Sequence, residues 1–214
     1  MATIGDFLDL APVIPVLTLE GAADGVPVAR ALVAGGLRVL EVTLRTAGAL
    51  EAVRAIAADV PGVLVGVGTV LETAQLAEAR RAGARFAVSP GHTAGLLAAA
   101  ADSGLPWLPG MSTVSEAMAL AERGYRDLKF FPAEPCGGAA FLRALPAPLP
   151  GLRFCPTGGI DASKAVEYLA LPNVPCVGGS WPVPAAAVRA ADWGRIETLA
   201  RAAAALRGAG KASD

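Results

Sequence analysis

Short β-rich runs recur along this chain at regular intervals, and this rhythm constrains the fold more than any other feature. Between them lie segments rich in alanine, leucine, glutamate and arginine, whose apolar residues follow helical spacing. The alternation predicts eight β-α units and therefore an α/β protein. The β-rich runs are residues 13–19, 38–44, 63–70, 85–89, 107–111, 127–131, 152–157 and 174–179.

The second β-rich run indicates how these units are arranged. Leu40 and Val42 alternate with Glu41 and Thr43, so one face of this strand is polar. In an open doubly wound, flavodoxin-like sheet, helices cover both faces of a central strand, so such a strand tends to be apolar throughout. A barrel strand, in contrast, can direct polar side chains inward near its C-terminal mouth. We therefore predict a (β/α)8 TIM barrel, with functional residues at the C-terminal ends of the strands.

No linker or charge run divides the 214 residues, so we expect a single domain over residues 1–214. The last residues, 207–214, become small and polar and are expected to fray.

Composition and charge exclude several classes of partner. The net charge of -1 provides no positive electrostatic field that would attract a polyanion. Only 5% of the residues are aromatic, so the sequence indicates no stacking platform for single-stranded nucleic acid. The longest uncharged run, residues 168–188, carries four prolines and a glycine pair, which a membrane helix could not accommodate. Asp6 and Asp9 lie where a signal peptide would be basic and then apolar. We expect a cytoplasmic protein without nucleic-acid or membrane partners.

The histidine and cysteine content argues against a metal site. The three cysteines, Cys136, Cys155 and Cys176, fit neither a disulfide framework nor a metal knuckle, and we interpret them as buried thiols. His92 is the only histidine, so no histidine-rich zinc or iron site can be assembled. It follows a turn, and we interpret it as a loop residue. We expect no metal and no cofactor.

The scarcity of lysine makes each lysine position informative. Of the 18 basic residues, only Lys129, Lys164 and Lys211 are lysines. Lys211 lies in the tail, and Lys164 falls on the polar start of a helix, where a solvated ammonium is expected. Lys129 lies within the sixth β-rich run, and alternation directs it with Phe131 into the barrel interior.

A buried lysine almost always forms an ion pair or takes part in the protein's chemistry. Lys129 is therefore either in an ion pair with Asp127 or an acid on a neighbouring strand, or it is a neutral amine that attacks a ketone. Glu41 faces the same interior and is the natural proton-transfer partner, while Arg45, nearer the mouth, can hold a substrate carboxylate. The alternative is a Glu41–Arg45 pair in which the two groups satisfy only each other.

Glycine pairs follow the last two strands of the predicted barrel. These are Gly158-Gly159 and Gly178-Gly179, and Ser180 comes directly after the second pair. Each pair alone could be a tight turn. At these two strand ends, however, bare backbone N–H groups can approach phosphate oxygens and a serine hydroxyl adds a donor, so we predict a phosphate site.

Seven short motifs, in order and on separate strands, resemble the 2-keto-3-deoxy-6-phosphogluconate (KDPG) aldolases, including those that also cleave 4-hydroxy-2-oxoglutarate (KHG). The resemblance runs from about Pro12 to Pro184. The motifs are Glu41-Val42-Thr43-Leu44-Arg45, Gly66-Val67-Gly68-Thr69-Val70, Ser89-Pro90-Gly91, Pro109-Gly110, Lys129-Phe130-Phe131-Pro132-Ala133-Glu134, Pro156-Thr157-Gly158-Gly159-Ile160 and Val177-Gly178-Gly179-Ser180-Trp181.

The resemblance implies a class I, metal-free aldolase of the Entner–Doudoroff pathway that releases pyruvate and glyceraldehyde 3-phosphate, and it implies a homotrimer. Lys129 would form the Schiff base and Glu41 would be the acid/base. The family's remaining site residues correspond here to Arg45, Thr69 and Thr157 for the pyruvyl carboxylate, Pro90 and Phe131 for the shape of the site, and Gly158, Gly159, Gly179 and Ser180 for the phosphate.

Two departures from the family pattern, Pro135-Cys136 and His92, lie near the expected aldehyde product and bear on secondary substrates. Two other functions also fit the residues taken alone. One is a phosphosugar isomerase that uses carboxylate acid/base chemistry without a covalent intermediate. The other is a non-catalytic phospholigand-binding barrel in which Glu41 and Lys129 only pair. The sequence does not separate gluconate-derived from galactonate-derived substrates, which differ in one hydroxyl orientation at C4.

Overall fold

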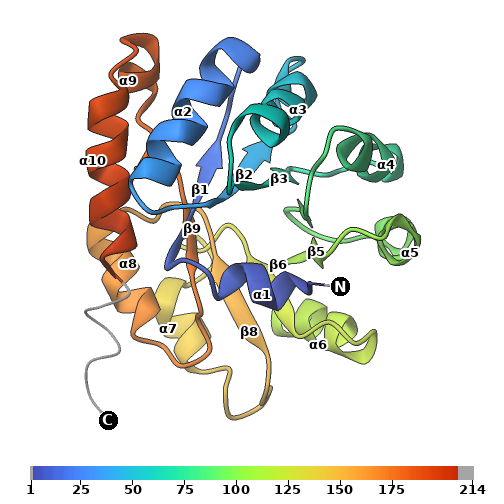
Figure 1. Ribbon diagram of the computed structural model, residues 1–214. Helices are drawn as coiled ribbons and strands as arrows, with labels where there is room; N and C mark the ends of the chain where they lie inside the picture. Colours follow the sequence, from blue (N-terminus) through green and yellow to red (C-terminus); the bar gives the residue numbers. More distant parts are fainter. Residues whose placement is uncertain (1, 207–214) are drawn as a thin grey trace.

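Parallel strands fill the centre of the molecule and helices surround them (Figure 1). The computed structural model describes residues 2–206, so the tail predicted at 207–214 lies outside the described part. The strands are β1 (Val13–Leu17), β2 (Val39–Thr43), β3 (Leu64–Gly68), β4 (Ala87–Val88), β5 (Trp107–Leu108), β6 (Gly110–Met111), β7 (Asp127–Phe130), β8 (Arg153–Pro156) and β9 (Val177–Gly179).

The helices alternate with the strands after a short N-terminal helix. Several begin at a side-chain cap, as at Thr93, Thr113 and Asp161, which accept hydrogen bonds from orphan backbone N–H groups. The helices are α1 (Ile4–Leu8), α2 (Ala22–Ala34), α3 (Ala49–Asp59), α4 (Thr73–Arg81), α5 (Ala94–Ser103), α6 (Val114–Glu122), α7 (Gly138–Arg143), α8 (Ala162–Leu169), α9 (Ala185–Arg189) and α10 (Trp193–Ala204).

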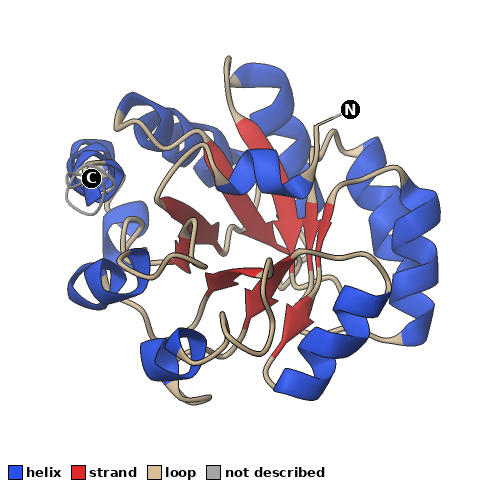
Figure 2. Ribbon diagram, turned by 90° about the horizontal axis from the view of Figure 1, so that it is seen from below, coloured by secondary structure: helices blue, strands red, loops and turns tan. Residues whose placement is uncertain are grey.

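The strands form two parallel sheets. One has the order β5-β4-β3-β2-β1-β9 and the other the order β6-β7-β8. A single bridge between Thr157 and Gly178 joins the end of β8 to β9. Seen from below, in Figure 2, the strands curl around the centre with helices outside them. The predicted α/β class with parallel strands is confirmed.

Each predicted β-rich run contains a strand, and the fifth run is divided. Pro109 separates β5 from β6. Proline has no backbone N–H and cannot donate to a strand ladder, which accounts for the interruption. Its carbonyl still accepts a hydrogen bond from the Lys129 backbone at 2.9 Å, so the chain keeps its place beside β7.

Two apolar clusters lie on opposite faces of the curled strands. Leu40, Val42, Leu128 and Phe130 belong to the larger cluster, which fills the space between strands and helices. The smaller cluster fills the inside of the curl near the N-terminal ends of the strands; it contains Ile14, Val39, Phe86, Val88, Leu108, Cys155 and Cys176.

Helix α1 covers this inner cluster. Phe7 and Leu8 are buried in it, and the Phe7 ring lies 5.4 Å from the Phe86 ring. Arg153, at the start of β8, fixes the helix by bonding Asp9 at 3.0 Å and Asp127 at 2.7 Å. The N-terminal end of the curl is therefore closed by apolar packing, and the polar interior residues lie toward the other end.

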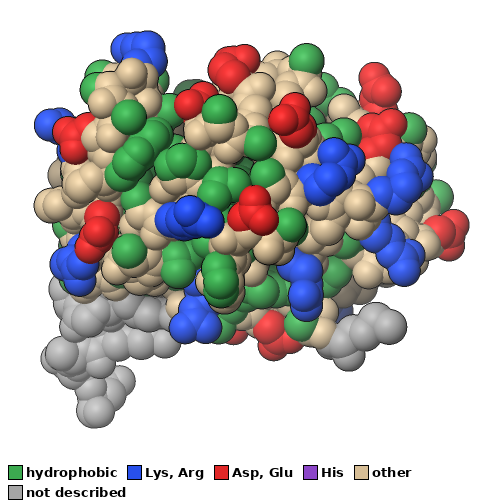
Figure 3. Space-filling view, turned by 45° about the horizontal axis from the view of Figure 1, so that its top comes forward, with side chains coloured by type: hydrophobic (Ala, Val, Ile, Leu, Met, Phe, Trp, Pro, Cys, Tyr) green, Lys and Arg blue, Asp and Glu red, His purple; other side chains and the backbone are tan. Residues whose placement is uncertain are grey.

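Charge is spread over the face shown in Figure 3 rather than gathered into one patch. Figure 3 shows lysine and arginine side chains interspersed with aspartate and glutamate on one face. Within residues 2–206, no helix has the length and apolar character needed to cross a membrane.

Phe7→Ala tests whether α1 closes the inner core. Loss of the buried ring should lower the free energy of unfolding by about 3–5 kcal/mol, because its cavity cannot refill completely. Leu10→Ala, at a side chain that is 46% exposed, is the control and should change it by less than about 0.5 kcal/mol. Denaturant unfolding measures both variants, and equal effects would contradict the assignment.

Candidate active site

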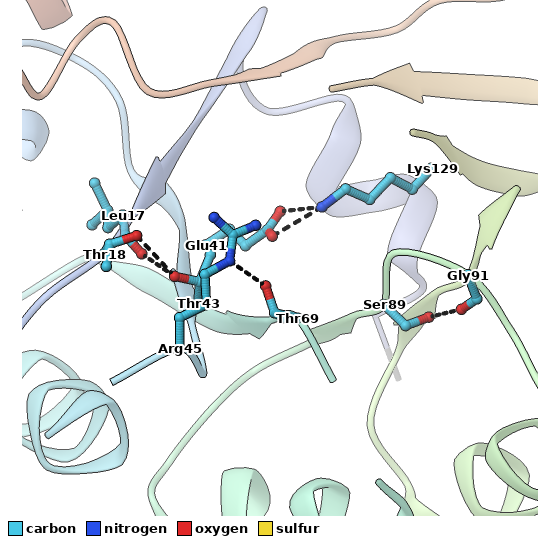
Figure 4. Close-up of polar contacts among 9 residues, drawn as sticks. All are labelled: Leu17, Thr18, Glu41, Thr43, Arg45, Thr69, Ser89, Gly91 and Lys129. Carbon is cyan, nitrogen blue, oxygen red and sulfur yellow. Dashed lines mark hydrogen bonds and ion pairs between the residues drawn. The ribbon is translucent and has the colours of Figure 1, made fainter. Parts of the chain in front are cut away.

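Glu41 of β2 and Lys129 of β7 meet inside the curled strands. Lys129 Nζ lies 3.0 Å from Glu41 Oε1 and 3.4 Å from Oε2, as Figure 4 shows. Glu41 is 4% exposed and Lys129 5%. The Lys129 ammonium also lies 5.6 Å from the centroid of the Phe131 ring, within cation–π range. The inward orientation predicted for Lys129 and Phe131 is confirmed.

Of the three ion pairs considered from sequence, the structure contradicts two and contains the third, between Glu41 and Lys129. Asp127 bonds Arg153 at 2.7 Å and is not the partner of Lys129. Glu41 pairs with Lys129 rather than with Arg45. The acid that meets the buried lysine therefore comes from a strand in the other sheet, not from a neighbouring strand.

A glycine on β3 makes room for the Glu41 carboxylate. A Cβ added at Gly68 would lie 2.0 Å from Glu41 Oε1, a distance that no side chain tolerates. Beside it, Thr43 donates to the Leu17 carbonyl at 2.9 Å and lies 3.1 Å from the Thr18 hydroxyl. Close backbone approach of β3 thus sets the position of the carboxylate.

Arg45 and Thr69 form a second polar pair toward the mouth. Arg45 Nε donates to Thr69 Oγ1 at 3.1 Å. Thr69 has a φ of 58°, which is unfavourable for a residue with a branched Cβ. Such positions persist where surrounding structure fixes them, and they cluster at functional sites. The bond to Nε holds the plane of the guanidinium, which suits bidentate carboxylate binding.

A cavity of about 240 Å³ lies where β1, β8 and β9 end. Seven residues predicted for the site line it: Arg45, Phe131, Thr157, Gly158, Gly159, Gly179 and Ser180. Gly178, which belongs to the second glycine pair noted in the sequence, also lines it, and three lining residues were not predicted: Val16, Thr18 and Ile160. Thr18 comes just after β1, as Arg45 comes just after β2. Its position at the end of a strand could therefore have identified it from the sequence.

Thr157 brings an unpartnered hydroxyl to this cavity. The residue is 7% exposed, and its Oγ1 is buried without a hydrogen-bond partner in the described part of the chain. Leaving a buried hydroxyl unpaired costs free energy unless a ligand or water completes it. Gly178 leaves space beside it, since an added Cβ there would lie 2.3 Å from Oγ1.

The glycine loop after β8 has a backbone conformation that favours glycine. Gly158 has a φ of 106° and Gly159 a φ of 79°. Successive N–H groups in turns of this kind can form a concave site for an anion. Gly179 is constrained differently, because any Cβ there would overlap the Trp181 ring. Glycine is therefore required at both strand ends.

Pro90 lies apart from the cavity lining. It packs on β6, where a Cβ at Gly110 would lie 2.2 Å from the Pro90 carbonyl. His92, in the same turn, has Nδ1 2.9 Å from the Gly110 carbonyl oxygen, so its prediction as a loop residue is confirmed. Across residues 2–206, no group of three or more histidine, cysteine, aspartate or glutamate residues could hold a metal ion.

The three cysteines differ in exposure. Cys155 and Cys176 are buried, as predicted, whereas Cys136 is half-buried, so that part of the prediction was wrong. Cys136 lies in the turn that connects β7 to α7.

Lys164 is exposed at the start of α8, as predicted, and it also has partners that the sequence did not indicate. Its Nζ lies 2.6 Å from Glu134 Oε2 and 3.2 Å from the Gly159 carbonyl oxygen. Its side chain is 45% exposed, which agrees with the polar start of α8. Only the fold brings Glu134, from the segment after β7, to this position.

Comparison with known proteins assigns the family. The family model described as "KDPG and KHG aldolase" matches residues 4–199. The "KHG/KDPG aldolase" of Escherichia coli K12 is 54% identical over 196 residues, covering 92% of each chain. This chain belongs to the KDPG and KHG aldolase family.

Two solved structures of relatives carry ligands. KDPG aldolase from Legionella pneumophila, with pyruvate captured as a covalent carbinolamine, superposes with a TM-score of 0.92 at 45% identity, covering 95% of this chain and 98% of the other. The KDPG aldolase of Zymomonas mobilis ZM4 with 3-phosphoglycerate has a TM-score of 0.91 at 46% identity, and 97% of each chain is covered.

Gly68→Ala tests whether β3 sets the Glu41 carboxylate. The added methyl group should displace Glu41 and lower the aldolase kcat about 100-fold, the size of effect expected for a 1 Å misplacement. Gly95→Ala is the matched control, because its Cβ would meet no atom closer than 3.9 Å, and it should keep kcat within about twofold. Circular dichroism verifies the fold of both. A folded Gly68→Ala enzyme with unchanged kcat would refute this role.

Proposed function

We propose that this chain is a class I aldolase that cleaves KDPG to pyruvate and glyceraldehyde 3-phosphate and also cleaves KHG. The buried Lys129–Glu41 pair carries the proposal, because it places a nucleophilic amine against a proton acceptor. The family assignment and the pyruvate carbinolamine in the Legionella relative support it.

The first step forms the bond between enzyme and substrate. Glu41 accepts a proton from the Lys129 ammonium 3.0 Å away, and the resulting amine attacks the C2 ketone. Glu41 then returns this proton to the carbinolamine hydroxyl, which leaves as water and gives a cationic iminium, so the carboxylate is again free to act as a base. This cation withdraws electrons from the adjacent carbon–carbon bond.

The second step breaks the C3–C4 bond. Glu41, directly or through a water molecule, removes the proton of the C4 hydroxyl, and the bonding pair moves into the iminium to give an enamine. Glyceraldehyde 3-phosphate leaves. Protonation of the enamine at C3 and hydrolysis of the resulting iminium then release pyruvate and regenerate Lys129.

The two ends of the substrate have separate binding groups in this proposal. Arg45, Thr69 and Thr157 bind the carboxylate, and the unpartnered Thr157 hydroxyl supports that role. Pro90 and Phe131 shape the site.

The phosphate is assigned to Gly158, Gly159, Gly179 and Ser180, which line one cavity. The 3-phosphoglycerate in the Zymomonas relative supports a phosphate-binding site in the family. Because the phosphate lies far from the breaking bond, its binding energy can orient that bond.

We further propose that the strands make one closed (β/α)8 barrel and that residues 1–214 form one domain. In this description β5 and β6 are a single strand interrupted at Pro109, and the Thr157–Gly178 bridge supports closure between β8 and β9. Assembly as a homotrimer and a cytoplasmic location complete the proposal. Sedimentation velocity tests the trimer.

Lys129→Met tests the covalent mechanism. The thioether cannot form an iminium, so release of pyruvate from KDPG should fall more than about 1000-fold in a coupled assay. The variant leaves Glu41 buried without a partner, which is destabilising. The double variant Glu41→Gln/Lys129→Met removes that unpaired charge and should also be inactive while folded. Cleavage by either folded variant would favour a non-covalent enzyme.

Ser180→Ala tests the phosphate site. Removal of one hydrogen bond to a charged group should cost about 1.5–3 kcal/mol, or about ten- to a hundredfold in kcat/KM for KDPG. KHG has no phosphate, so its kcat/KM should change less than about threefold. Kinetics on both substrates decide the matter. Equal losses would make Ser180 a general support of the mouth, and no loss on either would leave the phosphate to the glycine N–H groups.

A further inference from the structure

Three side chains outside the cavity converge behind its glycine loop. The Tyr168 hydroxyl donates to Glu134 Oε1 at 2.6 Å, and Lys164 Nζ lies 2.6 Å from Glu134 Oε2. Lys164 Nζ also donates to the Gly159 carbonyl at 3.2 Å. Both carboxylate oxygens of Glu134 are therefore engaged, and one of their partners holds the loop directly.

The backbone joins the same two segments. Ala133 N donates to the Thr157 carbonyl at 2.8 Å, and Glu134 N donates to the Gly158 carbonyl at 3.2 Å. A Cβ on Gly159 would lie 2.8 Å from Glu134 Cγ, so the loop packs tightly on this side chain. The segment that follows β7, the strand of Lys129, is thereby connected to the loop assigned to the phosphate.

The charges of this cluster balance one another. Lys164 donates to Glu134 and holds the pKa of its carboxyl below the usual range, while Glu134 raises the pKa of Lys164. Burial, together with the hydrogen bond to Glu134, raises the pKa of Tyr168. At neutral pH the cluster holds an ion pair and a neutral phenol. Because the pair has no net charge, it gives little long-range attraction for phosphate, and its effect on the loop is geometric.

Glycine loses more conformational freedom than any other residue type when its backbone becomes fixed, and this loop has two glycines at positive φ. A loop that is already fixed before the ligand arrives binds more tightly, because less ordering accompanies binding. Glu134, Lys164 and Tyr168 supply this fixing from outside the cavity, and none of them lines it.

We propose that Glu134, Lys164 and Tyr168 are positioning residues that hold the Gly158–Gly159 loop ready for the substrate phosphate and so give the enzyme its selectivity for phosphorylated keto acids. The inference rests on the proposed function. It predicts that loss of the cluster weakens binding at the phosphate end and spares the pyruvyl end of the same substrate.

Steady-state kinetics and pyruvate trapping on Lys164→Met and Tyr168→Phe test this. Lys164→Met should raise KM for KDPG about tenfold, with kcat within about threefold, and Tyr168→Phe should raise it by a smaller factor. The pyruvate concentration that half-saturates borohydride inactivation should change less than about twofold, since pyruvate has no phosphate. Lys164→Arg keeps a charged donor and should restore KM to within about threefold of the wild type.

Arg143→Met is the matched control. It also removes an ion pair between α7 and α8, that of Arg143 with Glu167, but both partners are more than half exposed and neither touches the loop. It should leave KM unchanged within about twofold.

The outcomes separate the two proposals. A wild-type enzyme that neither cleaves KDPG nor reacts with pyruvate and borohydride would refute the proposed function. An active wild type whose Lys164→Met variant keeps its KM, or loses affinity for KDPG and pyruvate equally, would refute only the positioning role.

Discussion

The ion pair between Glu41 and Lys129 is the constraint on which the rest of the structure depends. Two charged groups that are at least 95% buried are tolerated only when they satisfy each other, because removing either partner leaves an uncompensated buried charge. The arrangement requires β2 and β7, in different sheets, to face one another across the curl. It also requires glycine at position 68, where any side chain would occupy the place of the carboxylate. In the proposed mechanism the same pair contains both the nucleophile and its proton acceptor.

The interior is divided along the strands in a way that serves this pair. Toward the N-terminal ends, Phe7 and Leu8 of α1 close an apolar cluster and provide a rigid base. Toward the C-terminal ends the residues become polar, and the cavity lined by Arg45, Thr157 and the glycine loops opens there. Stability and chemistry thus occupy opposite ends of the same strands, as is usual for barrel-like α/β enzymes.

Much of the fold and of the candidate site could be predicted from residue patterns, because alternation in a strand determines which side chains point inward. Lys129 and Glu41 were identified in that way, and the glycine pairs by their places after strands. A pair between Glu41 and Lys129 was only one of the pairings considered, since the two residues are 88 positions apart and strand order alone does not fix which residues meet across the interior. Lys164 shows a different limit. It lies exposed at the start of a helix, as predicted, but its contact with Glu134 depends on the tertiary fold and could not be predicted. Residues 107–111 were predicted as one β-rich run although Pro109 lies within it, because the residues on both sides of the proline are typical of a strand.

The central claim is that Lys129 becomes covalently bound to the keto acid, and the site of a reduced adduct tests it most directly. The wild-type enzyme would be incubated with pyruvate and borohydride, digested, and its peptides sequenced by mass spectrometry. The account predicts a single borohydride-stable pyruvate adduct on the peptide that contains Lys129, and none when pyruvate is omitted. An adduct on Lys164 or Lys211, or no adduct from an enzyme that cleaves KDPG, would contradict it.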